Sequence, residues 1–152
     1  TLGKINFDSI IILDFGDSLK SLLTSLAYTD VSGEEILIVT SNQWFDQSLL
    51  SETSIKSFYF PSINFKNFKN FKKEFLNIYK YNPTEISILS YDAVGLIYYA
   101  WKQPGEIKSV NDFNFKKDIK GKVGKFNITN NKVIQKLKVY RIKDGNFTEY
   151  KF

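Results

Sequence analysis

The chain has 152 residues, a formal net charge of +5, and neither cysteine nor histidine. This length suits one domain or one half of a two-lobed protein. The missing residue types exclude disulfides, thiol nucleophiles and ordinary zinc sites, and they remove the commonest general base. No apolar stretch approaches the ~20 residues that a membrane helix needs. We therefore predict no metal, no cofactor and no enzymatic activity.

The basic residues do not indicate nucleic-acid binding. All of them except Arg141 are lysine, whereas surfaces that recognise nucleic acid normally include arginine. The segment Phe65–Lys80 mixes lysine with aromatic residues, as do stacking platforms for single strands. An amphipathic helix with a solvated lysine face is the better explanation. We expect no nucleic-acid partner.

The first third of the chain predicts a parallel α/β unit. The continuous apolar runs Ser9–Phe15 and Glu35–Ser41 are typical of buried strands. Gly16-Asp17-Ser18 offers a turn and an N-cap for a helix that ends near Tyr28. Its apolar stripe consists of Leu19, Leu22, Leu23 and Leu26. Two such strands joined by a helix form a right-handed parallel crossover.

A short strand and two helices are predicted next. The strand spans Ser57–Pro61, and the first helix spans Phe65–Tyr81. Asn82-Pro83 ends that helix and starts the second, with proline at an early helical position. The second helix ends at Gln103-Pro104-Gly105. Its broad apolar face consists of Ile86, Leu89, Ala93, Leu96, Ile97 and Trp101.

The tail predicts antiparallel strands. These are Val123–Ile128, Val133–Ile142 and Asn146–Phe152, separated by the hairpin signals Thr129–Lys132 and Lys143-Asp144-Gly145. The predicted fold class is therefore α/β, in a single domain over residues 1–152. A parallel α/β part covers residues 7–64, two helices cover 65–104, and a β-rich tail covers 119–152.

Ligands of an open parallel sheet bind beyond the carboxyl ends of its strands. The candidate binding residues at those ends are Phe15, Gly16 and Asp17 after the first strand, and Ser41, Asn42, Gln43 and Trp44 after the second. Two interpretations of the second loop stay open. It is a polar and aromatic wall of a cleft, or an ordinary loop in which Asp46 caps the next helical turn and Trp44 packs locally.

Four acidic residues are candidates for a chemical role. Asp14, Asp17 and Asp46 are the residue type for acid–base work or a hard cation, but capping and strand-end positions favour structural use. Asp92 lies in an otherwise apolar helical face. Because an unpaired buried acid is costly, we expect its carboxylate to accept hydrogen bonds from a neighbouring loop and to organise a structural hinge.

The order of these features resembles the type 1 periplasmic binding proteins, also called the Leu/Ile/Val-receptor-like fold, and specifically the C-terminal half of that fold. The matching motifs are the strand and glycine loop Ile10–Gly16, the strand and polar loop Ile36–Trp44, the strand Phe58–Pro61, the helix motif Phe75–Tyr79 with Pro83, the "YDA" motif Tyr91–Val94, and the strand Ile119–Phe126.

Within this family, Gln43–Asp46 and Leu49–Glu52 are most similar to the penicillin-binding-protein activator lipoproteins. That resemblance implies a non-catalytic periplasmic domain that regulates peptidoglycan synthesis by contact with a peptidoglycan synthase. It also implies a lipid anchor at the outer membrane, outside this chain.

The alternative is a solute receptor of an ABC transporter for amino acids of the Leu/Ile/Val type or other small molecules. Gln43 stands where the amino-acid receptors are expected to place an acid, so an α-ammonium group would lack its counter-charge. If the half-fold exists alone, the apolar faces of its two helices are exposed, which favours a homo-oligomer.

Overall fold

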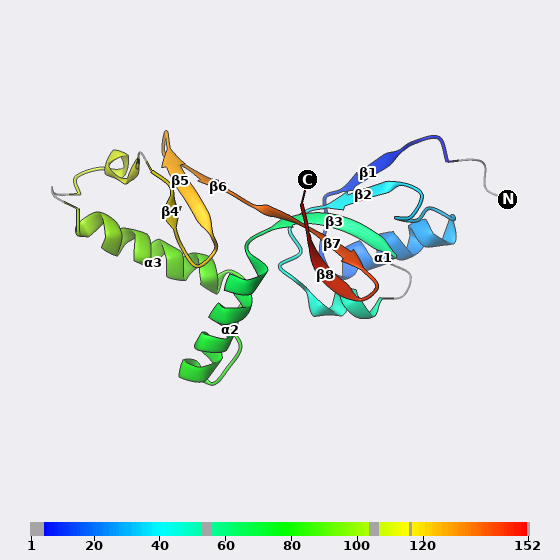
Figure 1. The fold of residues 1–152 in the computed structure, drawn as a ribbon, viewed down its shortest axis with the longest axis horizontal. Coiled ribbons are helices and arrows are strands. Elements are labelled where there is room, and N and C mark those ends of the chain that lie inside the picture. The colour runs from blue at the N-terminus through cyan, green and yellow to red at the C-terminus, as the bar shows by residue number, and fades with distance from the viewer. Residues whose placement is uncertain (1–4, 53–55, 104–106, 116, 152) are drawn as a thin grey trace. The chain divides into compact units, whose positions relative to one another are not determined.

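The computed structural model describes residues 5–52, 56–103, 107–115 and 117–151. The chain divides into two compact units. The first consists of Thr1–Ser62 and Lys138–Phe152, and the second of Ile63–Leu137. Each unit has its own β-sheet and its own helices (Figure 1). The fold is α/β, with a parallel-stranded sheet, three α-helices and antiparallel hairpins, as predicted.

The first unit is built on a five-stranded sheet with the order β1-β2-β3-β7-β8. Its strands are β1 (Ser9–Ile12), β2 (Leu37–Thr40), β3 (Ser57–Ser62), β7 (Lys138–Lys143) and β8 (Asn146–Tyr150). Strands β1, β2 and β3 are parallel, and β7 and β8 continue the sheet in antiparallel pairs. Helix α1 (Gly16–Tyr28) connects β1 to β2, and the 3-10 helix η1 (Gln47–Ser51) precedes β3. The predicted parallel crossover is confirmed.

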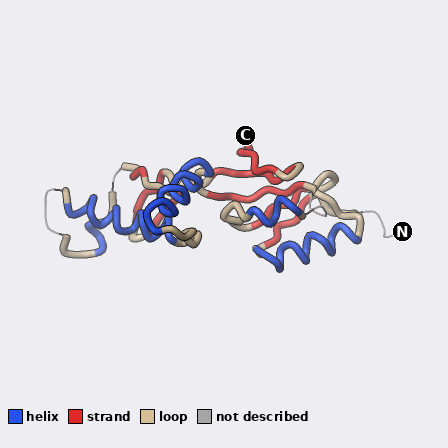
Figure 2. The backbone as a smooth tube through the Cα atoms, turned by 90° about the horizontal axis from the view of Figure 1, so that it is seen from below, coloured by secondary structure: helices blue, strands red, loops and turns tan. Residues whose placement is uncertain are grey.

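The core of the first unit lies between its helical segments and one face of the sheet. Helix α1 runs alongside the strands (Figure 2) and buries Leu19 and Leu23. The alternate strand residues Ile12, Ile38, Phe58, Phe60, Tyr140 and Ile142 are buried as well. Because side chains along a strand point to opposite faces in turn, these residues share the covered face of the sheet.

The other face of this sheet is open at β1. Ile11 is 71% exposed and Leu13 is 84% exposed, and Leu37 on β2 is 48% exposed. The prediction of a fully buried strand over Ser9–Phe15 is therefore wrong. The run is apolar on both faces, as in a strand covered on both sides. Here β1 is the edge strand, and the described residues cover only one of its faces.

The second unit combines two α-helices with a three-stranded antiparallel sheet. The elements are α2 (Phe65–Tyr79), α3 (Ser87–Trp101), the 3-10 helix η2 (Val110–Phe113), β4 (Ile119–Lys120), β5 (Lys125–Thr129) and β6 (Lys132–Gln135). The sheet order is β4-β5-β6. The buried hydrophobic residues described in this unit are Ile63, Phe68, Phe71, Ile88, Ala100, Val123, Phe126 and Ile128.

The helix ends differ from the predicted ones for local reasons. Helix α2 begins after Asn64, whose side chain accepts a hydrogen bond from the Asn67 N–H, and it ends at Tyr79 because Lys80 adopts a left-handed conformation with φ of 64°. Pro83 does not start α3. The chain makes a further turn, with the Ser87 N–H bonded to the Thr84 carbonyl at 3.1 Å, before the helix begins. The predicted end at Pro104-Gly105 lies outside the described residues.

The predicted strand Val133–Ile142 is two strands in two sheets. Strand β6 pairs with β5, whereas β7 pairs with β3, so the chain changes sheets at Lys136-Leu137. Both predicted hairpin turns are confirmed. Asn130 and Asn131 have φ of 51° and 59°, and Asp144 and Gly145 have φ of 50° and 69°, as a type I′ turn requires.

Candidate functional site

Two loops meet at the carboxyl edge of the parallel strands. Ile12 at the end of β1 is in register with Thr40 at the end of β2, so the following residues continue side by side. The Ser41 hydroxyl donates a hydrogen bond to the Asp14 carbonyl at 3.0 Å, and the Gln43 Nε2 donates to the same oxygen at 3.0 Å. The structure therefore brings together the two loops that the sequence indicated.

Gln43 is buried where these loops meet, with only 3% of its surface exposed. Its Nε2 also lies 3.1 Å from the Thr40 hydroxyl and 2.8 Å from the Ser41 carbonyl, so its two hydrogens are shared among three acceptors. Its Oε1 is buried and has no hydrogen-bond partner among the described residues. An acceptor left without a donor is costly. The Nε2 of Gln43 thus holds the two loops together.

The backbone of the second loop turns sharply inward. The Asn42 Oδ1 accepts hydrogen bonds from the Trp44 N–H at 2.9 Å and from the Ser62 hydroxyl at 2.8 Å. Trp44 and Phe45 follow with φ of 48° and 58°, which non-glycine residues rarely adopt. Phe45 is buried, and its ring contacts Phe60, Tyr140 and Phe147 edge to face. Trp44 itself is half-buried.

Asp46 caps η1, as one of the two sequence interpretations expects. Its Oδ1 accepts hydrogen bonds from the Ser48 N–H at 2.9 Å and from the Ser48 hydroxyl at 2.7 Å. The carboxylate of Asp14 accepts from the Phe15 N–H at 2.8 Å. No group of acidic residues that could hold a metal ion occurs among the residues that the structure describes.

The first loop exposes one aromatic side chain and one acid. Phe15 is 71% exposed and provides the N-cap backbone of α1, which begins at Gly16 with φ of +60° and has no side-chain cap. Asp17 therefore lies in the first turn instead of capping it. Its carboxylate forms an ion pair with Lys20 at 2.9 Å, and this hydrogen bond raises the pKa of Lys20.

Asp92 accepts hydrogen bonds from a neighbouring loop, as we expect from the sequence. The Lys122 and Val123 N–H groups donate to its two carboxylate oxygens at 2.7 Å and 2.8 Å. A Cβ atom at Gly121 would lie 2.4 Å from the Asp92 Oδ2, so this close approach requires glycine. The role of Asp92 as a hinge stays a prediction.

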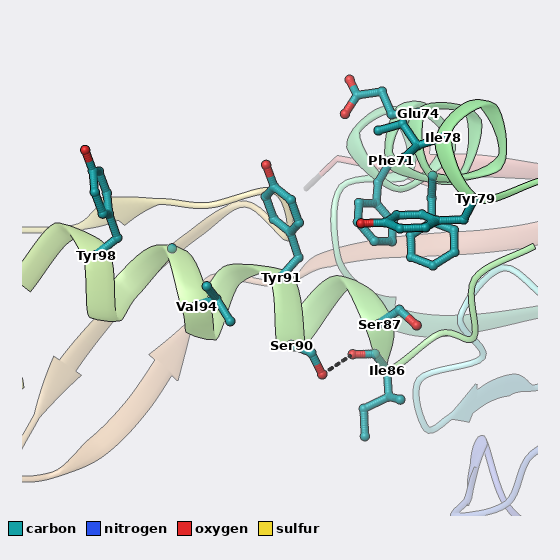
Figure 3. A pocket seen from close by; sticks show the side chains of 12 residues that line it. Phe71, Glu74, Ile78, Tyr79, Ile86, Ser87, Ser90, Tyr91, Val94 and Tyr98 are labelled. Carbon is teal, nitrogen blue, oxygen red and sulfur yellow. Dashed lines mark hydrogen bonds between the residues drawn. The ribbon is translucent and has the colours of Figure 1, made fainter.

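The second unit contains a groove that the sequence did not predict. It lies between α2 and α3, has a volume of about 760 Å³, and is lined mostly by apolar and aromatic side chains. Figure 3 shows Tyr91 and Tyr98 projecting from the same side of α3, and Phe71, Ile78 and Tyr79 reaching in from α2.

The rim of this groove carries one ion pair. Glu74 accepts a hydrogen bond from the Lys122 ammonium at 2.6 Å, which raises the pKa of Lys122. Sequence periodicity indicated an apolar face on α3, but it gave no sign of which part of that face the chain itself covers.

No protein-family model and no curated protein sequence matches this chain. Solved structures do. A leucine-binding protein, LivK, from Thermotoga maritima has 17% sequence identity and a TM-score of 0.63, over 96% of this chain and 44% of that one. An extracellular ligand-binding receptor from Desulfohalobium retbaense has 13% identity and a TM-score of 0.66, over 95% of this chain and 27% of that one.

These similarities show the fold of the type 1 periplasmic binding proteins, as the sequence motifs predicted. The chain spans less than half the length of each of these two structures. A specific similarity to the penicillin-binding-protein activators stays a prediction. No helix in the described ranges is long and apolar enough to cross a membrane.

Proposed function

We propose that this chain is part of a periplasmic or extracellular receptor that binds a small solute without chemical change. The observation that carries the proposal is the pair of loops joined by Gln43 and Ser41 at the carboxyl edge of a parallel sheet. That edge is where open α/β sheets bind ligands. The fold, shared with two proteins described as a leucine-binding protein and a ligand-binding receptor, supports the same conclusion.

The chemistry of the loops indicates the kind of solute. The N-terminus of α1 has no side-chain cap, and helix N-terminal N–H groups bind carboxylates and other anions. Phe15 adds an exposed apolar ring. A solute with an anionic group and an apolar part fits these groups, whereas Gln43 is a neutral amide and supplies no counter-charge to an α-ammonium group.

A thermal-shift screen with amino acids, sugars and muropeptides tests this proposal, because a ligand that binds only the native state raises its melting temperature. We expect a shift with a solute that has an anionic group and an apolar part, and we expect this shift to be lost in Phe15→Ala. Tyr28→Ala is the matched control, since Tyr28 is an exposed aromatic residue at the opposite end of α1. Receptor function is refuted if no solute shifts the melting temperature. If both variants respond like the parent chain, the loop at Phe15 is not the binding site.

Contact with a peptidoglycan synthase is a second candidate function. The exposed apolar pair Leu13 and Phe15, at 84% and 71%, lies beside the same loops, and such patches often mark protein contacts. The identity of the partner rests on the resemblance to the activator lipoproteins, as do an outer-membrane location and a lipid anchor. Surface plasmon resonance with a purified peptidoglycan synthase tests it. Binding that is lost in Leu13→Asp supports this function, and no binding refutes it.

A further inference from the structure

The positive charge of this chain is concentrated in one of its two units. The second unit, Ile63–Leu137, contains 14 lysines, no arginine and six acidic residues, a formal net charge of +8. The first unit contains seven basic and ten acidic residues, a formal net charge of −3. Because the two units are nearly equal in length, a compositional bias of the whole gene does not explain the difference. Such a charge asymmetry indicates that the second unit meets an anionic partner.

Helix α2 carries a row of these lysines. Lys66, Lys69 and Lys73 recur at intervals of three and four residues, which places them along one face of the helix. All three are exposed, and none forms an ion pair with a carboxylate of the described residues. Lys72 borders them, and its ammonium lies 5.4 Å from the centre of the Phe68 ring. We call these four lysines the α2 lysine face.

The α2 lysine face is the solvated side of a helix whose apolar side is already buried. Phe68 and Phe71 are 4% and 3% exposed, so α2 packs its apolar side within its own unit. A further segment of protein would pack on apolar surface in preference to this face, since burying an unpaired charge is costly. The lysines are therefore open to a partner whether or not other segments precede or follow the chain.

Two features favour a lipid surface over a nucleic acid as the anionic partner. The second unit uses lysine alone. Lysine is a hydrated point charge, whereas arginine makes the bidentate contacts by which proteins recognise fixed phosphates and bases. Leu76 is 41% exposed and lies three and seven residues after Lys73 and Lys69, on the same face. An apolar side chain among lysines suits the interface of a bilayer, which accepts both.

We propose that the α2 lysine face holds this protein against an anionic lipid surface. The attraction is electrostatic and reversible, because the apolar side of α2 is packed in its own unit and does not insert into the bilayer. Each lysine near such a surface raises the binding constant about fivefold. The strand-end loops take no part in this contact. The proposal therefore goes beyond solute binding and stands or falls separately from it.

Co-sedimentation of the chain with vesicles tests the proposal. The vesicles contain equal parts of phosphatidylglycerol and phosphatidylcholine, and vesicles of phosphatidylcholine alone are the neutral comparison. We expect binding to the anionic vesicles only, and its loss between about 0.1 M and about 1 M salt, as the screening length falls from about 10 Å to about 3 Å. The triple variant Lys66→Gln, Lys69→Gln, Lys73→Gln lowers the binding constant about 100-fold. Because glutamine is as good a helix former as lysine, its circular dichroism spectrum stays that of the parent.

A second triple variant is the matched control. Lys120→Gln, Lys125→Gln, Lys132→Gln removes the same charge from exposed positions on β4, β5 and β6 of the same unit and lowers the binding constant less than about fivefold. Equal losses in the two triple variants overturn the proposal, because binding then follows the net charge of the unit and not the α2 lysine face. Equal binding to both kinds of vesicle, or to neither, also overturns it. Single-stranded DNA is tested in parallel, and binding to DNA without binding to the anionic vesicles assigns the face to nucleic acid instead.

Discussion

The Asp92 carboxylate gives the sharpest test of how the second unit is held together. It accepts backbone hydrogen bonds from Lys122 and Val123 at 2.7 Å and 2.8 Å in a half-buried position. Asp92→Asn keeps the shape but has only one acceptor oxygen, so one N–H group loses its partner and faces an amide donor. Hydrogen bonds to charged groups contribute about 1.5–3 kcal/mol each, so we expect a loss of about 3 kcal/mol.

Urea denaturation followed by circular dichroism measures this loss. With a slope of about 2 kcal/mol per molar, the midpoint falls by about 1.5 M. Hydrogen exchange of the Lys122 and Val123 amides should accelerate in the same variant.

Asp112 provides a control for Asp92. Its carboxylate accepts backbone hydrogen bonds from Lys108 and Ser109, also at 2.7 Å and 2.8 Å, but through Oδ2 alone and on an exposed side chain. Because Asn keeps one acceptor oxygen, and because solvent replaces lost hydrogen bonds at an exposed site, Asp112→Asn should cost clearly less. If the two variants lower the midpoint equally, or if the Lys122 and Val123 amides keep their protection in Asp92→Asn, the half-buried position and the use of both oxygens do not determine the strength of the Asp92 contact.

Three more outcomes follow from close contacts. Gly121→Ala brings a Cβ to 2.4 Å from the Asp92 Oδ2 and should lower the free energy of unfolding by about 1–3 kcal/mol in urea denaturation. An unchanged urea midpoint contradicts the close approach of Gly121 to Asp92. Gly33→Ala places a Cβ 1.7 Å from the Ser57 carbonyl oxygen, so we expect loss of the folded sheet by circular dichroism, and a native spectrum is the contrary result. The hydrogen bond to Glu74 raises the pKa of Lys122 above its usual 10.5. The stabilisation of the fold by this ion pair is therefore complete below pH 10.5 and is lost as the pH rises through the raised pKa. Melting curves should show this alkaline loss in the parent and not in Glu74→Gln.

Local sequence patterns predicted the strands, helices and turns of this fold better than they predicted which faces of these elements are covered. The hairpin turns at Asn130-Asn131 and Asp144-Gly145 were recognisable because those residues tolerate positive φ. The parallel crossover between β1 and β2 followed from two apolar runs with a helix between them. The burial of β1 was not predictable in the same way, because an apolar run records which faces a strand can bury but not which elements cover it.

In the candidate site, too, local patterns predicted the position of the loops but not the contacts that their side chains make. Strand ends indicated the loops at Phe15 and Gln43, and the structure brings these loops together. The inward position of the Gln43 side chain depends on the distant Asp14 carbonyl, 29 residues away in sequence, and no local pattern contains that information. The groove between α2 and α3 was missed for a related reason. Periodicity identifies an apolar face but does not say whether the chain itself covers it.

The two consecutive left-handed residues Trp44 and Phe45 have a consequence for the thermodynamics of binding. Each such conformation costs about 1–3 kcal/mol, and the Phe45 ring holds it in place through its contacts with Phe60, Tyr140 and Phe147. Folding therefore fixes this loop before any ligand arrives. The solute binding that we propose would therefore require little further loss of loop entropy, and its heat should come from direct contacts with the loop.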